Sequence, residues 1–90
     1  MTYMSYNKIK YDMRVAYGGH DLQAEYLSEL RNRLGKTQQE VANEAEISLR
    51  QYQRLEAGKS PVDKMAISAG LRLAKALNTT IEKIIAEGSN

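Results

Sequence analysis

Side chains that can read the edges of DNA bases are concentrated between residues 49 and 54. Arginine can donate two parallel hydrogen bonds to guanine, glutamine can pair with adenine, and an apolar side chain can contact the thymine methyl group. If this stretch is a helix, Tyr52 and Leu55 turn inward and the intervening residues turn outward. The outward set that this spacing predicts is Leu49, Arg50, Gln51, Gln53 and Arg54.

Two short predicted helices must position this set. Thr37-Gln-Gln-Glu40 has the pattern of a capping box, and Ser48-Leu-Arg-Gln51 repeats it, so each sequence indicates the start of a helix. A tight turn at Glu46-Ile47 separates the helices, and Gly58 closes the second one. Ala42 is small where the two helices must approach closely. The residues predicted to face inward are Val41, Ala45, Ile47, Tyr52 and Leu55.

A helix is predicted before this pair. Asp21 can cap it, apolar residues recur at helical spacing as far as Leu34, and Gly35 suits a left-handed stop.

Two more helices are predicted after the pair. Ser60-Pro61 places a proline at the first helical position and predicts a long helix to Leu77, with Asn78 as its terminator. Thr79-Thr-Ile-Glu82 is a further capping box, which begins a short helix through Ala86. The predicted fold class is therefore all-α, with five helices.

Residues before Gly18 follow a different pattern. Ile9, Tyr11, Met13, Val15 and Tyr17 alternate with other residues, and this period of two is typical of a strand. Nothing else in the chain resembles a partner strand, so pairing with the same segment of a second subunit is one prediction. A helix and a mobile basic arm are the alternatives. We expect residues 1–20 to form this arm or strand and residues 21–87 the helical domain.

The composition narrows the classes of function. Lysine and arginine number 13 against 11 aspartates and glutamates, a net charge of +2, so a DNA partner would require the positive charge to gather on one face. The chain has no cysteine, no stretch long and apolar enough to span a membrane, and no signal sequence, which favours a cytoplasmic location.

Catalysis and cofactor binding find little support. His20 is the one histidine and has no neighbouring set of ligands for a metal. Gly58-Lys59-Ser60 matches the end of a phosphate-binding loop, but Gln53 stands where that motif needs a glycine. No serine or threonine has a histidine base beside it in a local pattern. We expect no cofactor, no metal and no enzymatic activity.

The chain resembles the Cro/repressor (Xre-type, lambda-repressor-like) helix-turn-helix family across roughly residues 26–85. The resemblance rests on Leu30-Arg-Asn-Arg-Leu-Gly35, Thr37-Gln38, Val41-Ala42, Ile47-Ser48, Leu55-Glu56-Ala-Gly58-Lys59 and Leu73-Ala-Lys-Ala-Leu77. It implies a compact five-helix domain whose third helix, about residues 49–57, lies in the major groove.

The resemblance also implies roles for individual residues. Gln38 is expected to contact a DNA phosphate, and Arg31 and Glu56 are expected to form an ion pair between the first and third helices. Lys59 can meet the DNA backbone, while Lys36 is expected either to contact a phosphate or to be solvated. The complete set of expected DNA-binding residues is Lys36, Gln38, Ser48, Leu49, Arg50, Gln51, Arg54 and Lys59.

This chain departs from the family pattern in three places. Glu46 holds a turn position that is usually glycine, so the turn must accept a positive φ in a residue with a side chain or take another shape. Tyr52 is bulkier than the usual residue, and its hydroxyl can reach toward a phosphate. The segment between Gly58 and Leu73 is longer than the commonest spacing, which lengthens the fourth helix or its leading loop.

These features together predict a homodimeric transcriptional repressor that binds double-stranded DNA, with two recognition helices in successive turns of the major groove. Two alternatives remain. One is an antitoxin-like regulator whose N-terminal segment binds a protein partner, such as a toxin or an anti-repressor. The other is an interaction module that binds only protein.

Overall fold

The computed structural model describes residues 19–89 of the chain, the side chains at both ends of this range excepted. Within this range the chain forms five α-helices and no strand, so the all-α prediction is confirmed. The predicted N-terminal strand, helix or arm lies outside the described residues. The elements in chain order are α2 (Gly19–Arg33), α3 (Gln38–Ala45), α4 (Leu49–Glu56), the 3₁₀ helix η2 (Val62–Lys64), α5 (Ile67–Ala76) and α6 (Ile81–Ser89).

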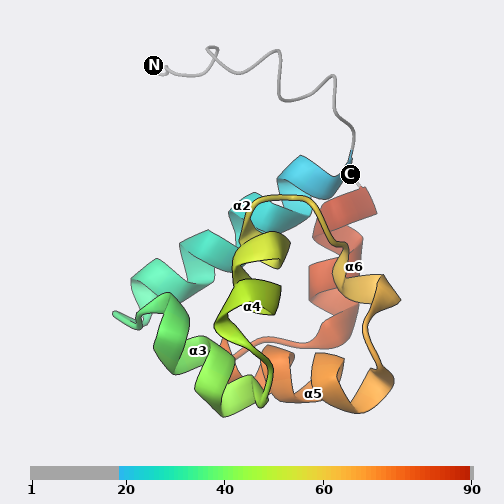
Figure 1. Cartoon of the computed structure of the whole chain (residues 1–90). Coiled ribbons are helices and arrows are strands. Elements are labelled where there is room, and N and C mark those ends of the chain that lie inside the picture. The colour runs from blue at the N-terminus through green and yellow to red at the C-terminus, as the bar shows by residue number, and fades with distance from the viewer. Residues whose placement is uncertain (1–18, 90) are drawn as a thin grey trace, which may run out of the picture.

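The helices surround one apolar core. In Figure 1, α6 lies beside the first half of α2, and α3 packs against both α4 and α5. Each of the five helices contributes to the core, whose largest fully buried side chains are Leu27, Val41, Tyr52, Leu55, Val62, Leu73, Leu77 and Ile84. Ala42 and Ala45 are also buried, and Ile47 packs partly buried against this core, as the spacing of these residues predicts.

The short-range helix signals are confirmed in the central part of the chain. Thr37 and Glu40 form the complete capping box at the start of α3. The Ser48 hydroxyl accepts a hydrogen bond from the backbone N–H of Gln51 at the start of α4. Gly35 and Gly58 both take positive φ where their helices end, which a residue without a side chain does at no steric cost.

The predicted long helix from Pro61 to Leu77 is wrong. Pro61 and Met65 both have extended backbone and enclose η2, so the helix proper begins only at Ile67. The reason lies in α2: the backbone N–H of Val62 donates to Oε1 of the buried Gln23 at 2.6 Å. This contact holds Val62 in the core, where it is 2% exposed.

Two other boundaries differ from the prediction. Helix α2 already includes Gly19, so Asp21 lies inside the helix rather than capping it. The cap of α6 is Thr80, whose hydroxyl accepts from the N–H of Lys83, because the Thr79 hydroxyl is hydrogen bonded to the Tyr26 hydroxyl at 2.9 Å. Asn78 ends α5 with a φ of 57°, as expected, and α6 continues past Ala86 to Ser89.

None of the helices between residues 19 and 89 is both long and apolar enough to cross a membrane.

The Gln23–Val62 hydrogen bond gives a test of this part of the fold. Replacing Gln23 with alanine removes the partner of a buried N–H, which should cost about 1–3 kcal/mol of unfolding free energy. Urea unfolding followed by circular dichroism measures the loss. Gln51→Ala is the matched control, since Gln51 is exposed, and it should change the free energy by less than about 0.5 kcal/mol. Equal effects of the two substitutions would contradict the assigned role of Gln23.

Candidate nucleic-acid interface

Helix α4 separates its polar and apolar residues onto two faces. Tyr52 and Leu55 are buried, Leu49 is half-buried at the start of the helix, and the rest of the outer face is exposed. The exposed side chains are Arg50, Gln51, Gln53 and Arg54. Because two of these are arginines, this face carries positive charge and several exposed hydrogen-bond donors.

The turn before α4 is built around a strained residue. Glu46 takes the left-handed conformation, with φ 59° and ψ 43°, so of the two possibilities left open by the sequence the positive φ is the one observed. Arg72 of α5 stabilises this turn: its Nε donates to the carbonyl of Ala45 at 2.9 Å and lies 3.8 Å from Oε1 of Glu46. The acidic side chain of Glu46 therefore has a cationic neighbour. Arg72 carries no local signal that the sequence analysis could have used.

A hydrogen-bond network around the Glu56 carboxylate fixes α4 against the two preceding helices. Arg31 of α2 binds both oxygens, through Nε to Oε2 at 2.6 Å and through Nη2 to Oε1 at 3.1 Å. Gln38 of α3 donates from Nε2 to Oε1 at 3.1 Å. The Tyr52 hydroxyl donates to Oε2. The Arg31–Glu56 ion pair that the family resemblance implies is thus present, with side chains only 16% and 7% exposed.

The direction of the Tyr52 side chain corrects the expectation that its hydroxyl reaches toward DNA phosphate. The residue is fully buried and its hydroxyl points inward, because the Glu56 carboxylate lies within the same helix turn and accepts its hydrogen bond. Burial and the hydrogen bond to Glu56 raise the pKa of Tyr52 above its ordinary value, so the phenol stays a donor.

The carboxyl group of Glu56 is held in its ionised form. Burial alone would raise the pKa of Glu56, but the hydrogen bonds from Arg31, Tyr52 and Gln38 together outweigh it, and the pKa is lowered. The hydrogen bond to Glu56 correspondingly raises the pKa of Arg31. The network therefore contains a permanent charge pair at neutral pH.

Gln38 connects this network to the exposed face of α4. Its Oε1 accepts a weak hydrogen bond from Nε2 of Gln53 at 3.4 Å, while its Nε2 donates to Glu56. These two contacts determine which way the amide points. An amide nitrogen carries two hydrogens, so a second donor of Gln38 is available at the start of α3, next to the exposed residues of α4.

The lysines expected to contact DNA differ in their surroundings. Lys59 is exposed just after α4, next to Ser60, whose hydroxyl accepts from Nε of Arg54 at 3.2 Å. Lys36 makes different contacts, away from Arg54 and Ser60. Its Nζ donates to Oε1 of Glu44 at 2.7 Å and to the carbonyl of Ala76 at 2.8 Å, so it connects α3 to the end of α5. Contact between Lys36 and DNA stays a prediction.

The contacts of Gln38 with Gln53 and of Arg54 with Ser60 thus place the start of α3 and the loop after α4 beside the exposed face of α4. Two short helices joined by a tight turn, with the second presenting a polar and basic outer face, form a helix-turn-helix. A family model described as a helix-turn-helix domain matches residues 24–84. Since this match covers more than half of the chain, the protein belongs to that family, which is of the Xre/Cro-like type. No curated protein and no solved structure matches the chain.

The lowered pKa of Glu56 predicts a specific dependence of stability on pH. A carboxyl group with a lowered pKa in the folded state stabilises the fold above its unfolded pKa, about 4.3, and loses this contribution as pH falls through the folded pKa. Glu56→Gln should lower the unfolding free energy on the order of 3 kcal/mol at pH 7, because Arg31 is left without its counter-charge. Urea unfolding from pH 7 to pH 2 measures the difference between the two proteins.

This difference should shrink as the pH falls below the unfolded pKa, and it should be lost once the pH is below the lowered pKa of Glu56 in the folded protein, where the wild-type carboxyl group is also neutral. Glu29→Gln is the control, since Glu29 forms an exposed pair with Arg33 and should give a small difference at every pH. A Glu56→Gln effect that stays constant down to pH 2 would show that charge at Glu56 is not what stabilises the network.

Proposed function

We propose that this protein is a sequence-specific DNA-binding regulator of transcription, acting as a repressor, that inserts α4 into the major groove. The observation that carries the proposal is the exposed polar face of α4, held rigidly from behind by the Glu56 network. A rigid support favours base recognition, since bidentate contacts between arginine and guanine require the helix to keep one position. A helix-turn-helix domain is itself indicative of a DNA-binding regulator.

Phosphate contacts would flank this helix on both sides. The second donor of Gln38 lies at the start of α3, and Lys59 lies just past the end of α4. These two groups bracket the residues proposed to read bases, so they can fix the position of α4 along the DNA backbone. Base contacts would come from Arg50, Gln51 and Arg54, with Leu49 beside a thymine methyl group.

Repression would follow from occupancy of a promoter by a homodimer. One helix of this size reads only a few base pairs, so a pair of helices about 34–36 Å apart on a roughly palindromic site would supply the specificity. No enzymatic activity and no cofactor form part of the proposal.

Selection of bound sequences from a random pool of DNA duplexes tests whether the protein is a sequence-specific, dimeric DNA-binding regulator. A palindromic consensus with half-sites one turn apart is expected.

The two alternatives predict other outcomes of the same experiment. A protein-only interaction module would give no enrichment and no binding even at low salt. An antitoxin-like regulator would still select a consensus sequence. In addition, the full chain would bind a protein partner, and a variant without residues 1–18 would no longer bind it.

Arginine substitutions in α4 test base recognition. Arg50→Ala or Arg54→Ala should weaken binding to the selected site by about 1–3 kcal/mol while changing binding to random DNA much less. Fluorescence anisotropy with both duplexes measures the two losses. Arg33→Ala is the control, because Arg33 is an exposed residue of α2 paired with Glu29. Equal losses of affinity for both duplexes would show that the arginine contacts a phosphate and does not recognise a base.

Substitution of Lys59 is expected to change the salt dependence of DNA binding and not its sequence preference. If Lys59 neutralises one phosphate, Lys59→Ala should weaken binding to every sequence alike and reduce the slope of log affinity against log salt by about 1. Titrations at several salt concentrations give this slope. Lys83→Ala in α6, also exposed, is the matched control and should leave it unchanged. An unchanged slope for Lys59→Ala would place Lys59 outside the interface.

A further inference from the structure

An apolar furrow runs between η2, α5 and α6. Two of its side chains are unusually exposed for their type, Ile67 at 81% and Leu71 at 53%. Val62, Met65, Ile81 and Ile85 also line it, and Asp63 is the charged residue among the lining set. No lining residue belongs to α3 or α4, so the furrow is separate from the surface proposed to bind DNA.

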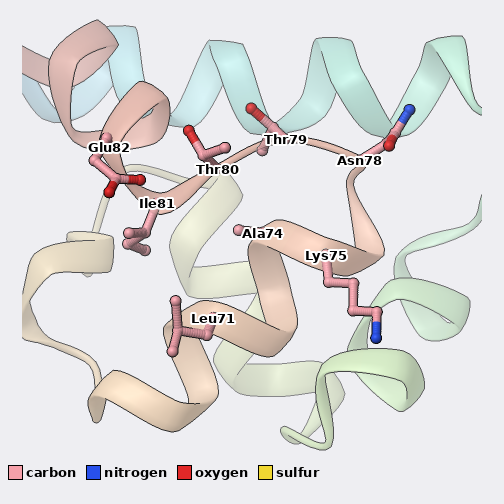
Figure 2. A pocket seen from close by; sticks show the side chains of 8 residues that line it. All are labelled: Leu71, Ala74, Lys75, Asn78, Thr79, Thr80, Ile81 and Glu82. Carbon is pink, nitrogen blue, oxygen red and sulfur yellow. The ribbon is translucent and has the colours of Figure 1, made fainter.

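The furrow continues past Leu71 and Ile81 into a second hollow. Figure 2 shows these two side chains between α5 and the start of α6, with Glu82 near one end of the hollow and Lys75 toward the other. Gly70 allows the close approach of the two helices here, since a Cβ at this position would lie 3.2 Å from Cδ1 of Ile81. The apolar floor is therefore close-packed and already formed.

Apolar surface of this kind is costly to leave in water. Burial of an isoleucine or leucine side chain against a partner contributes favourably to the free energy of binding. A contiguous exposed patch of such side chains is therefore typical of a binding site. The position of the furrow points to a partner that is already attached to the molecule.

The chain that precedes α2 starts near one end of the furrow. Gln23, in the first turns of α2, lies against Gly88 of α6, where a Cβ would meet its Nε2 at 2.9 Å. Ile81 is seven residues from Gly88 along α6, which is about 10 Å at the rise of an α-helix. Residues 9–17 in extended form would span about 30 Å, so the segment is long enough to reach the whole furrow from Gly19.

The composition of this segment matches the furrow. Its apolar residues fall at every second position, so an extended backbone would turn all of them to one side. Lys8, Lys10, Asp12 and Arg14 fall at intervening positions, so these positions carry a net positive charge. On the folded domain, Asp63 is the charged residue that lines the furrow, whereas the adjoining hollow holds both Glu82 and Lys75. The negative charge of the furrow itself therefore suits a segment of net positive charge.

We propose that Ile9, Tyr11, Met13, Val15 and Tyr17 bind in the furrow between η2, α5 and α6 of the same chain. Because the segment is tethered at α2, its last residues would lie near α6 and its first residues near Ile67. The furrow is thus the docking site of the protein's own N-terminal segment. This inference does not depend on the proposed function, since it concerns a surface apart from α3 and α4.

A nitroxide label on the full-length protein tests the proposal. The chain has no cysteine, so Ala16→Cys gives a single attachment point, and Ala16 lies at an intervening position that the furrow does not need. In ¹⁵N spectra, the amides of Leu71 and Ile81 should lose most of their intensity through paramagnetic relaxation, whereas those of Gln39 and Asn43 in α3 should keep theirs.

A substitution in the furrow separates binding from mere proximity. Leu71→Lys, introduced into the labelled protein, should restore the intensity at Ile81. Leu34→Lys is the matched control, because Leu34 is a leucine of similar exposure, at 40%, that does not line the furrow. It should leave the loss of intensity unchanged. Broadening that is insensitive to Leu71→Lys, or no broadening of Leu71 and Ile81 at all, would overturn the proposal.

A mixed sample identifies which chain supplies the segment. Protein enriched in ¹⁵N but without a nitroxide is mixed with nitroxide-labelled protein at natural isotope abundance. No broadening at Leu71 or Ile81 is expected, since each segment binds its own chain. Broadening in the mixture would show that a second copy of the protein supplies the segment, and the proposal of binding within one chain would be wrong.

Discussion

The buried carboxylate of Glu56 is the interaction on which the arrangement of the helix-turn-helix depends. It receives hydrogen bonds from Arg31 in α2, Gln38 in α3 and Tyr52 in α4 itself, so one side chain joins three helices. Burying a charge pair is expensive, and the net gain in stability from such a pair is often small. Its larger effect is on geometry, because a carboxylate with both oxygens occupied leaves α4 a single orientation relative to α2 and α3. The direction in which the polar outer face of α4 points is fixed by the same contacts.

The turn between α3 and α4 shows how tertiary contacts can support an unfavourable local conformation. A left-handed residue with a side chain costs roughly 1–2 kcal/mol compared with glycine. At Glu46, the C-terminal end of α3 is covered by Arg72, which satisfies the carbonyl of Ala45 and places a positive charge near the Glu46 carboxylate. Helix α5 therefore has a role beyond core packing: it fixes the turn that sets the position of α4.

Much of the fold and of the candidate site could be predicted from local patterns. Helix starts are marked by hydrogen bonds between residues three apart, Thr37 with Glu40 and Ser48 with Gln51. Helix ends are marked by Gly35 and Gly58, which can adopt a positive φ. The inward and outward faces of α4 follow from helical periodicity alone. The predictions failed where a residue distant in sequence competes for the same group. Val62 is held by Gln23, and Thr79 is engaged by Tyr26, so the helix starts near both positions move.

By itself, the sequence determined that this protein contains an all-α domain with a helix-turn-helix and a basic, glutamine-rich second helix, because caps, turns and periodicity act over only a few residues. Only the tertiary structure decided that the Tyr52 hydroxyl donates to Glu56 and that Lys36 joins α3 to α5. It also decided that Ile67 and Leu71 line an apolar furrow on the surface of residues 19–89. The physical reason is the same in each case. A polar group binds the best partner that folding brings within about 3 Å, and an apolar side chain is buried only if another element covers it.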